Sequence, residues 1–190
     1  TLFGQYDCFC DGITYKISDD CGKTWRQMPV ISPEGYLKGA AVRGNIVELP
    51  DGSLLMPFYG PKNLNELNRA GLMKSDDRGE SWYYYSEMAF DPMSGKHFLE
   101  PALFRTESGR LVGLHHTQSD YLKKSVDFEQ TYLNLHLSVS EDNGKTFGPV
   151  LEADKVWSSN PFHALKLKSG KVLVTYGYRR KPYGIRARLC

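Results

Sequence analysis

Three short segments of the sequence align without gaps, and each has the form Ser-x-Asp-x-Gly-x-(Thr/Ser)-(Trp/Phe). They are SDDCGKTW at 18–25, SDDRGESW at 75–82 and SEDNGKTF at 140–147, and their starts lie 57 and 65 residues apart. Recurrence at such a spacing is typical of repeat architectures. In each copy the Asp can accept backbone N–H groups of a turn and the Gly can adopt a positive φ. We therefore expect three tight hairpins with a structural Asp.

A second signal recurs out of phase with the first. Pairs of apolar strands joined by a tight glycine turn begin at Val47, Leu103 and Leu165. Alternating strands flank the Ser-x-Asp hairpins, at Ile13–Ser18, Ala70–Ser75 and Leu133–Ser140 before them and at Trp82–Met88 after the second. One unit is thus four strands: A and B around the glycine turn, C before the Asp hairpin and D after it. This pattern predicts an all-β chain.

These hairpins resemble the Asp-box, or BNR, repeats of sialidase-like β-propellers, and the resemblance covers nearly the whole chain. The closing stretch NPFHALKLKSGKVLVTYGYRRKPYGIRARL is especially similar to bacterial proteins of the exo-sialidase and BNR-repeat type. The resemblance implies propeller blades of four antiparallel strands, about three in number, within a single domain over residues 1–190. It is less specific for activity, because one fold hosts many functions.

The expected ring is incomplete. At this period a six-bladed propeller needs on the order of 350 residues, and the chain has 190. Tyr183–Cys190 fits a C strand whose Asp-box would begin at Cys190, and no A and B strands are visible for the first unit. Three explanations stay open: a fragment of a longer protein, a half-ring that dimerises into six blades, or a small open stack. Because an open sheet edge invites pairing, we expect a homodimer that completes the propeller.

Composition excludes several functional classes. The chain carries 24 Lys and Arg against 22 Asp and Glu, with no basic run beyond Arg179–Lys181, so no nucleic-acid partner is expected. No apolar run is long enough to cross a membrane, and the first ten residues lack the pattern of a signal peptide, which leaves the compartment open. The four cysteines match no zinc or redox spacing. We expect free thiols, although Cys8 or Cys10 could bridge to Cys21 in an oxidising compartment. No cofactor or metal is expected.

In propellers of this family the ligand lies near the axis, at the tops of the A strands, on the face opposite the Asp-boxes. Three equivalent positions there read Arg43-Gly44, Glu100-Pro101 and Asn160-Pro161. The adjoining loops add aromatic, basic and acidic residues. The candidate catalytic residues are Glu100, Tyr178 and Asp120, and the candidate substrate-binding residues are Arg43, Tyr59, His116, Tyr176, Arg179 and Arg180.

These residue types suit an acidic or polyhydroxylated ligand, because guanidinium groups grip carboxylates bidentately and aromatic rings stack on sugars. The sialidase resemblance implies an Arg cluster on the substrate carboxylate, filled by Arg43, Arg179 and Arg180. It also implies a Tyr nucleophile, Tyr176 or Tyr178, activated by Glu100. Asp120 would be the acid/base. The Arg-Ile-Pro element that opens a true sialidase is not present. His115 and His116 point to opposite faces of a strand, which argues against a metal pair.

Two functions follow as hypotheses. The first is a sialidase-like exo-glycosidase that acts on or binds a carbohydrate. The alternative is a non-catalytic propeller fragment that binds a glycan or a protein.

Overall fold

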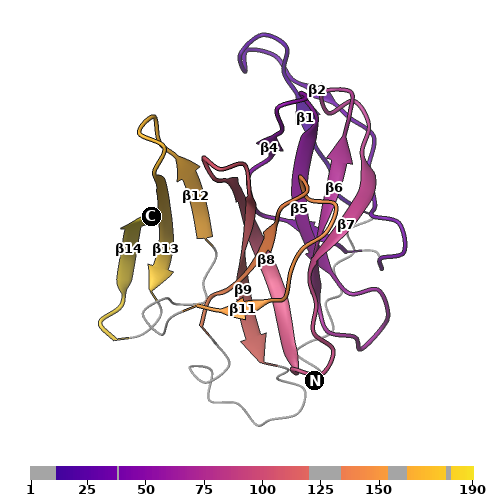
Figure 1. Ribbon diagram of the computed structural model, residues 1–190. Helices are drawn as coiled ribbons and strands as arrows, with labels where there is room; N and C mark the ends of the chain where they lie inside the picture. The colour runs from indigo at the N-terminus through magenta and orange to yellow at the C-terminus, as the bar shows by residue number, and fades with distance from the viewer. Residues whose placement is uncertain (1–11, 38, 120–133, 154–161, 179–180) are drawn as a thin grey trace.

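The described residues of the computed structural model, 12–37, 39–119, 134–153, 162–178 and 181–190, form four antiparallel sheets and no helix (Figure 1). The first sheet pairs β1 (Lys16–Ile17) with β2 (Arg26–Gln27). The second contains β3 (Ala41–Val42), β4 (Val47–Glu48), β5 (Leu54–Gly60), β6 (Arg69–Ser75) and β7 (Tyr83–Ala89). The third contains β8 (Lys96–Arg105), β9 (Leu111–Ser119), β10 (His136–Ser140) and β11 (Leu151–Glu152). The fourth contains β12 (Phe162–Lys166), β13 (Val172–Tyr178) and β14 (Gly184–Leu189).

The expected A–B–C–D order is confirmed in the second and third sheets, where neighbouring strands follow one another in sequence. The fourth sheet has the A, B and C strands, and the described part of the first has C and D. Each A strand connects to its B strand through the predicted glycine turn. Gly52, Gly109 and Gly170 have φ values of 83°, 93° and 84° there, which only glycine adopts readily.

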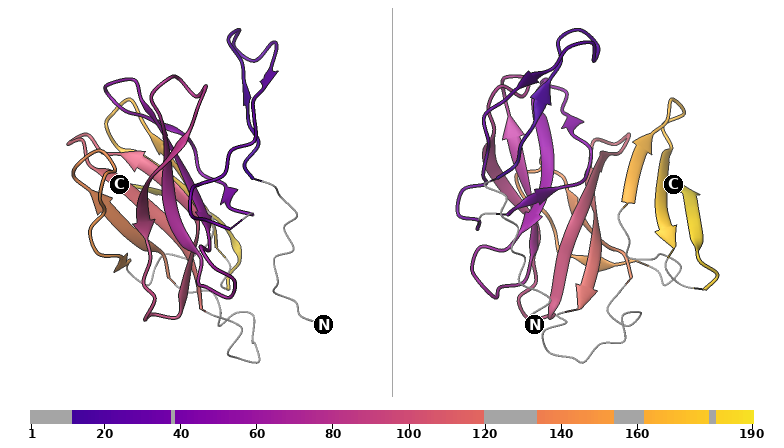
Figure 2. Two further views of the ribbon diagram at one scale, coloured as in Figure 1. Left: turned by 90° about the vertical axis from the view of Figure 1, so that its right-hand side faces the viewer. Right: turned by 180° about the vertical axis from the view of Figure 1, so that it is seen from behind.

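Neighbouring sheets lie next to one another in a row (Figure 2). Buried apolar clusters join each sheet to the next. Leu55 and Leu72 of the second sheet share one buried cluster with Leu103 and Leu111 of the third. A second cluster joins the third and fourth sheets, and its members are Ala102, Leu114, Leu135, Phe162, Ala164, Val172, Val174 and Tyr176. A third covers the other face of the second sheet with residues Ile13, Ala40, Met56, Phe58 and Met73.

The Asp-box hairpins have the predicted bonding, illustrated by the copy at residues 140–147. Asp142 Oδ1 accepts from the Thr146 backbone N–H at 2.9 Å, and Asp142 Oδ2 accepts from the Thr146 hydroxyl at 2.7 Å. The Gly144 N–H donates to Ser140 Oγ at 2.8 Å. The two bonds from Thr146 favour the ionised carboxylate and lower the pKa of Asp142 to about 2. The same bonds recur around Asp20 and Asp77, so the Asp residues are structural, as the sequence predicted.

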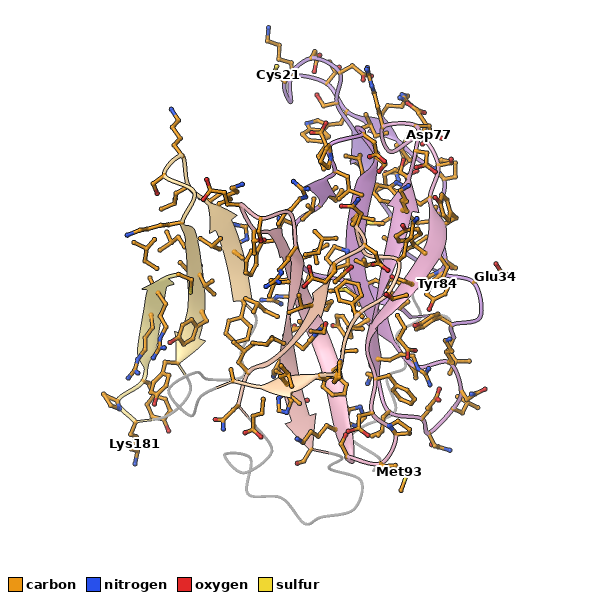
Figure 3. The ribbon with its side chains drawn as sticks, viewed as in Figure 1. Cys21, Glu34, Asp77, Tyr84, Met93 and Lys181 are labelled. Atoms are coloured by element: carbon orange, nitrogen blue, oxygen red, sulfur yellow. The ribbon has the colours of Figure 1, made fainter. Side chains whose placement is uncertain are left out.

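The Asp-boxes mark one end of the molecule. Figure 3 shows Cys21 and Asp77 at that end, whereas Met93 and Lys181 lie at the opposite end, which we call the loop end. Strand β9 runs towards the loop end and β10 returns from it (Figure 1). No helix in the described part of the chain could cross a membrane.

Candidate functional site

A bulge in β8 shapes the centre of the third sheet. Leu99 pairs with His116 and Ala102 pairs with Leu114, so Glu100 and Pro101 together face a single residue of β9. Glu100 takes a φ of 43°, a left-handed conformation that costs a non-glycine residue free energy. Bulges of this kind re-aim a side chain and are frequent beside functional sites. The sequence placed Glu100 at the top of its strand, and this position is wrong, because Lys96–Leu99 already pair with β9.

A similar irregularity interrupts the A strand of the second sheet. Val42 pairs with Phe58 of β5 and Val47 with Leu55, so the four residues between Val42 and Val47 face only two of β5. Arg43 and Gly44 lie in this interruption. A Cβ added to Gly44 would lie 2.3 Å from the Pro101 carbonyl oxygen. The two irregular segments are therefore in direct contact, and the absence of a side chain at Gly44 permits it.

This contact brings Arg43 and Glu100 together across the two sheets. Arg43 Nη1 lies 3.3 Å from Glu100 Oε1, and His116 Nδ1 lies 2.8 Å from Glu100 Oε2. The side chain of Arg43 is 57% exposed, that of Glu100 17% and that of His116 6%. The carboxylate is thus held between one partly solvated cation and one buried imidazole. Such an arrangement fixes the orientation of Glu100 while leaving guanidinium donors of Arg43 accessible to a ligand.

His115 and His116 point to opposite faces of β9, as the strand alternation predicted. His115 Nε2 lies 2.9 Å from Ser138 Oγ, and its ring stands edge-on to Phe98. Full burial lowers the pKa of His115 to about 3, since desolvation disfavours the imidazolium. Among the described residues, no group of three His, Cys, Asp or Glu side chains is arranged to hold a metal ion.

The structure places the candidate tyrosines separately. Tyr59 is half-buried near the end of β5, where it pairs with Ala41. Tyr176 is buried and its ring centroid lies 5.5 Å from that of Phe162. The guanidinium carbon of Arg186 lies 3.2 Å from the ring centroid of Tyr178, a cation–π contact. Ligand contact by these tyrosines remains a prediction. Asp120, Arg179 and Arg180 lie outside the described residues.

The sequence reasoning did not predict one charged cluster, which joins β6 and β7 to the loop between β5 and β6. Arg69 bonds both Glu66 and Glu87, the latter at 2.7 Å, and its guanidinium lies 3.4 Å from the ring centroid of Phe90. Glu66 also accepts the backbone N–H of Lys62 at 3.0 Å. Through Arg69, these contacts tie the loop at 61–68 to β7. In the sequence, only the three-residue spacing of Glu66 and Arg69 indicates an ion pair. Glu87 on β7 is distant in sequence from Arg69, so no local pattern predicts that they pair.

One family model matches nearly the whole length of the chain. Residues 7–190 match the BNR repeat-like domain. The chain belongs to this family. No curated protein sequence matches it. Among solved structures, a protein of unknown function from Dyadobacter fermentans is similar with a TM-score of 0.75 and 27% identity, and the alignment covers 94% of this chain and 48% of that one.

Two enzymes share the fold of this BNR-repeat chain. The α-L-arabinanase of Penicillium chrysogenum aligns with a TM-score of 0.64 at 21% identity over 94% of this chain and 55% of its own. The NanB sialidase of Streptococcus pneumoniae aligns with a TM-score of 0.65 at 18% identity over 93% of this chain and 25% of its own. The BNR-repeat chain thus spans about half or less of the proteins it resembles. It is an all-β chain whose propeller fold is also that of these two enzymes.

Proposed function

We propose that this BNR-repeat chain acts on a carbohydrate as part of an exo-glycosidase of sialidase type, with Glu100 as its catalytic carboxylate. One observation carries the proposal: a strained bulge sets Glu100 between Arg43 and His116. Backbone strain at a non-glycine residue persists only where the surrounding structure enforces it, and such strain clusters at active sites. The enzymes among the similar folds, sialidases and arabinanases, supply the substrate class.

Each residue of the trio has a distinct role. Glu100 is paired with Arg43 at Oε1 and with His116 at Oε2, and these two contacts orient it as a general base toward an attacking hydroxyl. His116 is a positioning residue, because its nearly buried ring contacts Glu100 through Nδ1. Arg43, with more than half of its side chain exposed, binds carboxylate or hydroxyl oxygens of the sugar. Asp120 and Tyr178 remain the candidates for acid/base and nucleophile.

Hydrolysis is tested with fluorogenic 4-methylumbelliferyl glycosides, with the sialoside first and the α-L-arabinofuranoside second. Glu100→Gln should lower kcat/KM by about 100-fold or more, which is the usual contribution of a positioned acid or base. Glu141→Gln is the matched control, because Glu141 also pairs with an arginine of its sheet, Arg110, at 2.8 Å, but at the Asp-box end. Equal rates for Glu100→Gln and the wild type would remove Glu100 from the mechanism.

Glycan binding without hydrolysis is the second candidate. It is favoured by the contacts of Glu100 with Arg43 and His116, because a general base needs a carboxylate oxygen directed at the proton of the substrate and both oxygens of Glu100 have partners in the protein. Titration calorimetry with sialyllactose and arabinobiose separates the two functions. The binding function is supported if the chain binds one of these sugars without hydrolysing it and the Arg43→Ala substitution weakens that binding. Both proposed functions are overturned if the chain neither binds nor hydrolyses any of the sugars tested.

A further inference from the structure

We propose that Lys96 and His136 form a binding site for an oxyanion, a carboxylate or a sulfate, at the loop end of the third sheet. Lys96 begins β8 and His136 begins β10, and Lys96 Nζ lies 3.1 Å from His136 Nε2. Met93, which lies shortly before Lys96 in the chain, marks the loop end in Figure 3. The site shares no residue with the trio of Arg43, Glu100 and His116, so it does not depend on the proposed function.

The Lys96 side chain crosses β9 to reach this histidine. Lys96 pairs with Ser119 of β9, whereas His136 pairs with His115, so β9 lies between the two strands. Residues paired across a ladder share one face of the sheet, as do residues two apart along a strand. Lys96, Thr117 and His136 therefore project from the same face. The lysine extends over this face and is half-buried.

His136 accepts a hydrogen bond from Lys96 without neutralising its charge. His136 Nδ1 lies 2.9 Å from the Asn134 carbonyl oxygen. A carbonyl only accepts, so we assign the ring hydrogen to Nδ1, which leaves Nε2 as the acceptor for the ammonium. Burial favours this neutral ring by lowering the pKa of His136. The histidine is 3% exposed, and Thr117 Oγ1 lies 3.1 Å from Nδ1, so the ring is held in one orientation.

The Lys96 ammonium has no carboxylate partner among the residues that the structure describes. Lys74 of the second sheet shows the contrasting arrangement, because its side chain is 15% exposed and its ammonium pairs with Asp76 at 2.8 Å. Glu152, opposite His136 in the ladder, accepts a hydrogen bond from the Asn134 side chain at 2.7 Å. Two of the three N–H groups of Lys96 thus have no acceptor in the described part of the chain.

A half-buried ammonium without a counter-ion favours an anionic ligand. Taking a charge out of water costs free energy unless an opposite charge replaces the lost hydration. The oxygen atoms of a carboxylate or a sulfate accept N–H groups in short, charge-assisted hydrogen bonds. Because His136 holds one N–H of Lys96, the other two point away from the ring. The chemistry that this pair recognises is therefore that of an oxyanion, supplied by a free ion or by the acid group of a sugar.

Sodium sulfate and sodium glucuronate distinguish these two sources. Each is titrated into the 190-residue chain at constant ionic strength, with sodium chloride as the balancing salt, and amide NMR signals are followed. The signals of residues 94–97 and 136 should shift and reach saturation. Lys96→Met keeps the length of the side chain but removes its charge. It should raise the Kd by about tenfold or more, as expected for the loss of a hydrogen bond between charged groups.

Two further variants serve as controls. Lys96→Arg keeps the positive charge and should retain binding. Lys171→Met removes an exposed lysine of the glycine turn between β12 and β13 and should leave the Kd unchanged. Circular dichroism checks that each variant keeps the wild-type fold.

Saturable shifts that Lys96→Met weakens and Lys171→Met does not affect support the proposal. Sulfate binding alone identifies a free ion as the ligand, and glucuronate binding alone identifies the acid group of a sugar. No saturable shift with either anion overturns the proposal. So does binding that Arg43→Ala abolishes and Lys96→Met leaves intact, because the anion then occupies the candidate site. If Lys96→Met does not fold, the wild-type titration decides, and shifts confined to other residues overturn the proposal.

Discussion

The candidate site depends on single residues whose backbone requirements are unusual. Glu100 adopts a positive φ without being glycine, and Gly44 permits a backbone approach that no other residue allows. Both residues lie where the A strands of neighbouring sheets touch. The ion pair of Arg43 with Glu100 is therefore a consequence of close backbone packing and not only of charge attraction.

Gly44→Ala tests this dependence. The new Cβ would meet the Pro101 carbonyl oxygen at 2.3 Å and Pro57 at 2.9 Å, so the two A strands must separate. We expect the free energy of unfolding to fall by about 1–3 kcal/mol, the usual cost of overpacking. Any glycosidase activity should fall with it, because Arg43 moves away from Glu100.

Urea denaturation measures the loss. Gly148→Ala is the matched control, because the nearest atom to its added Cβ is the Val139 carbonyl oxygen at an ordinary 3.6 Å. Equal stabilities of the two variants would show that the sheets can part at Gly44 without cost.

At the scale of elements, the Asp-box joins sheets as well as strands. The Gly144 carbonyl accepts the Ser86 hydroxyl of β7 at 2.5 Å, and a Cβ at Gly144 would touch Leu72 and Leu55 of the second sheet. The second Asp-box is tied to the first sheet in a related way, because Glu80 bonds Arg26. The second and third hairpins thus contribute to their own sheets and to the contact with the preceding one.

Ser140→Ala is expected to weaken this element. The Ser140 hydroxyl is buried, donates to Asp142 Oδ1 at 2.8 Å and accepts the Gly144 N–H at 2.8 Å. Its removal leaves the buried Gly144 N–H without that acceptor, which costs about 1–3 kcal/mol. Thermal unfolding checks the loss. Ser169→Ala, in an exposed glycine turn, should change the melting temperature little, and an equal fall in both variants would contradict the role of the hairpin.

At the scale of the whole molecule, acid should destabilise the fold in two pH windows. Burial lowers the pKa of His115 to about 3 and also lowers that of His136, beside Lys96. Unfolding restores a value near 6.5. The unfolded chain therefore binds more protons, and stability falls as the pH drops below 6.5 toward 3. The Asp-box carboxylates, with pKa values of about 2, contribute a second loss below about 3.8.

His115→Gln separates the windows. The amide can keep a hydrogen bond to Ser138 but does not titrate, so the slope of unfolding free energy between pH 5.5 and 4 should decrease by about 1.4 kcal/mol per pH unit. Urea denaturation at a series of pH values measures it. An unchanged slope would mean that His115 is not the titrating group, and the loss below pH 3.8 should remain in the variant.

The sequence by itself determined the repeating elements. The three Asp-boxes, the glycine turns and the strand order are encoded locally, because hydrogen bonds within eight residues and a positive φ at glycine require no distant partner. The spacing of these repeats also located the A strands. On successive A strands, Arg43 and Glu100 occupy equivalent positions, which made both of them candidates for the site. It also predicted that His115 and His116 point to opposite faces.

Only the tertiary structure decided how these elements meet. The β8 bulge, the fit of Gly44 against Pro101 and the bond from His116 to Glu100 arise between strands distant in sequence. The exposure of Ile185 likewise depends on whether another sheet covers it, since its strand pattern matches that of buried Leu135. Local sequence specifies which face of a strand is apolar, but burial is a property of the assembled sheets. For that reason the repeat and the candidate residues could be predicted from the sequence, whereas the contacts that join Arg43, Glu100 and His116 could not.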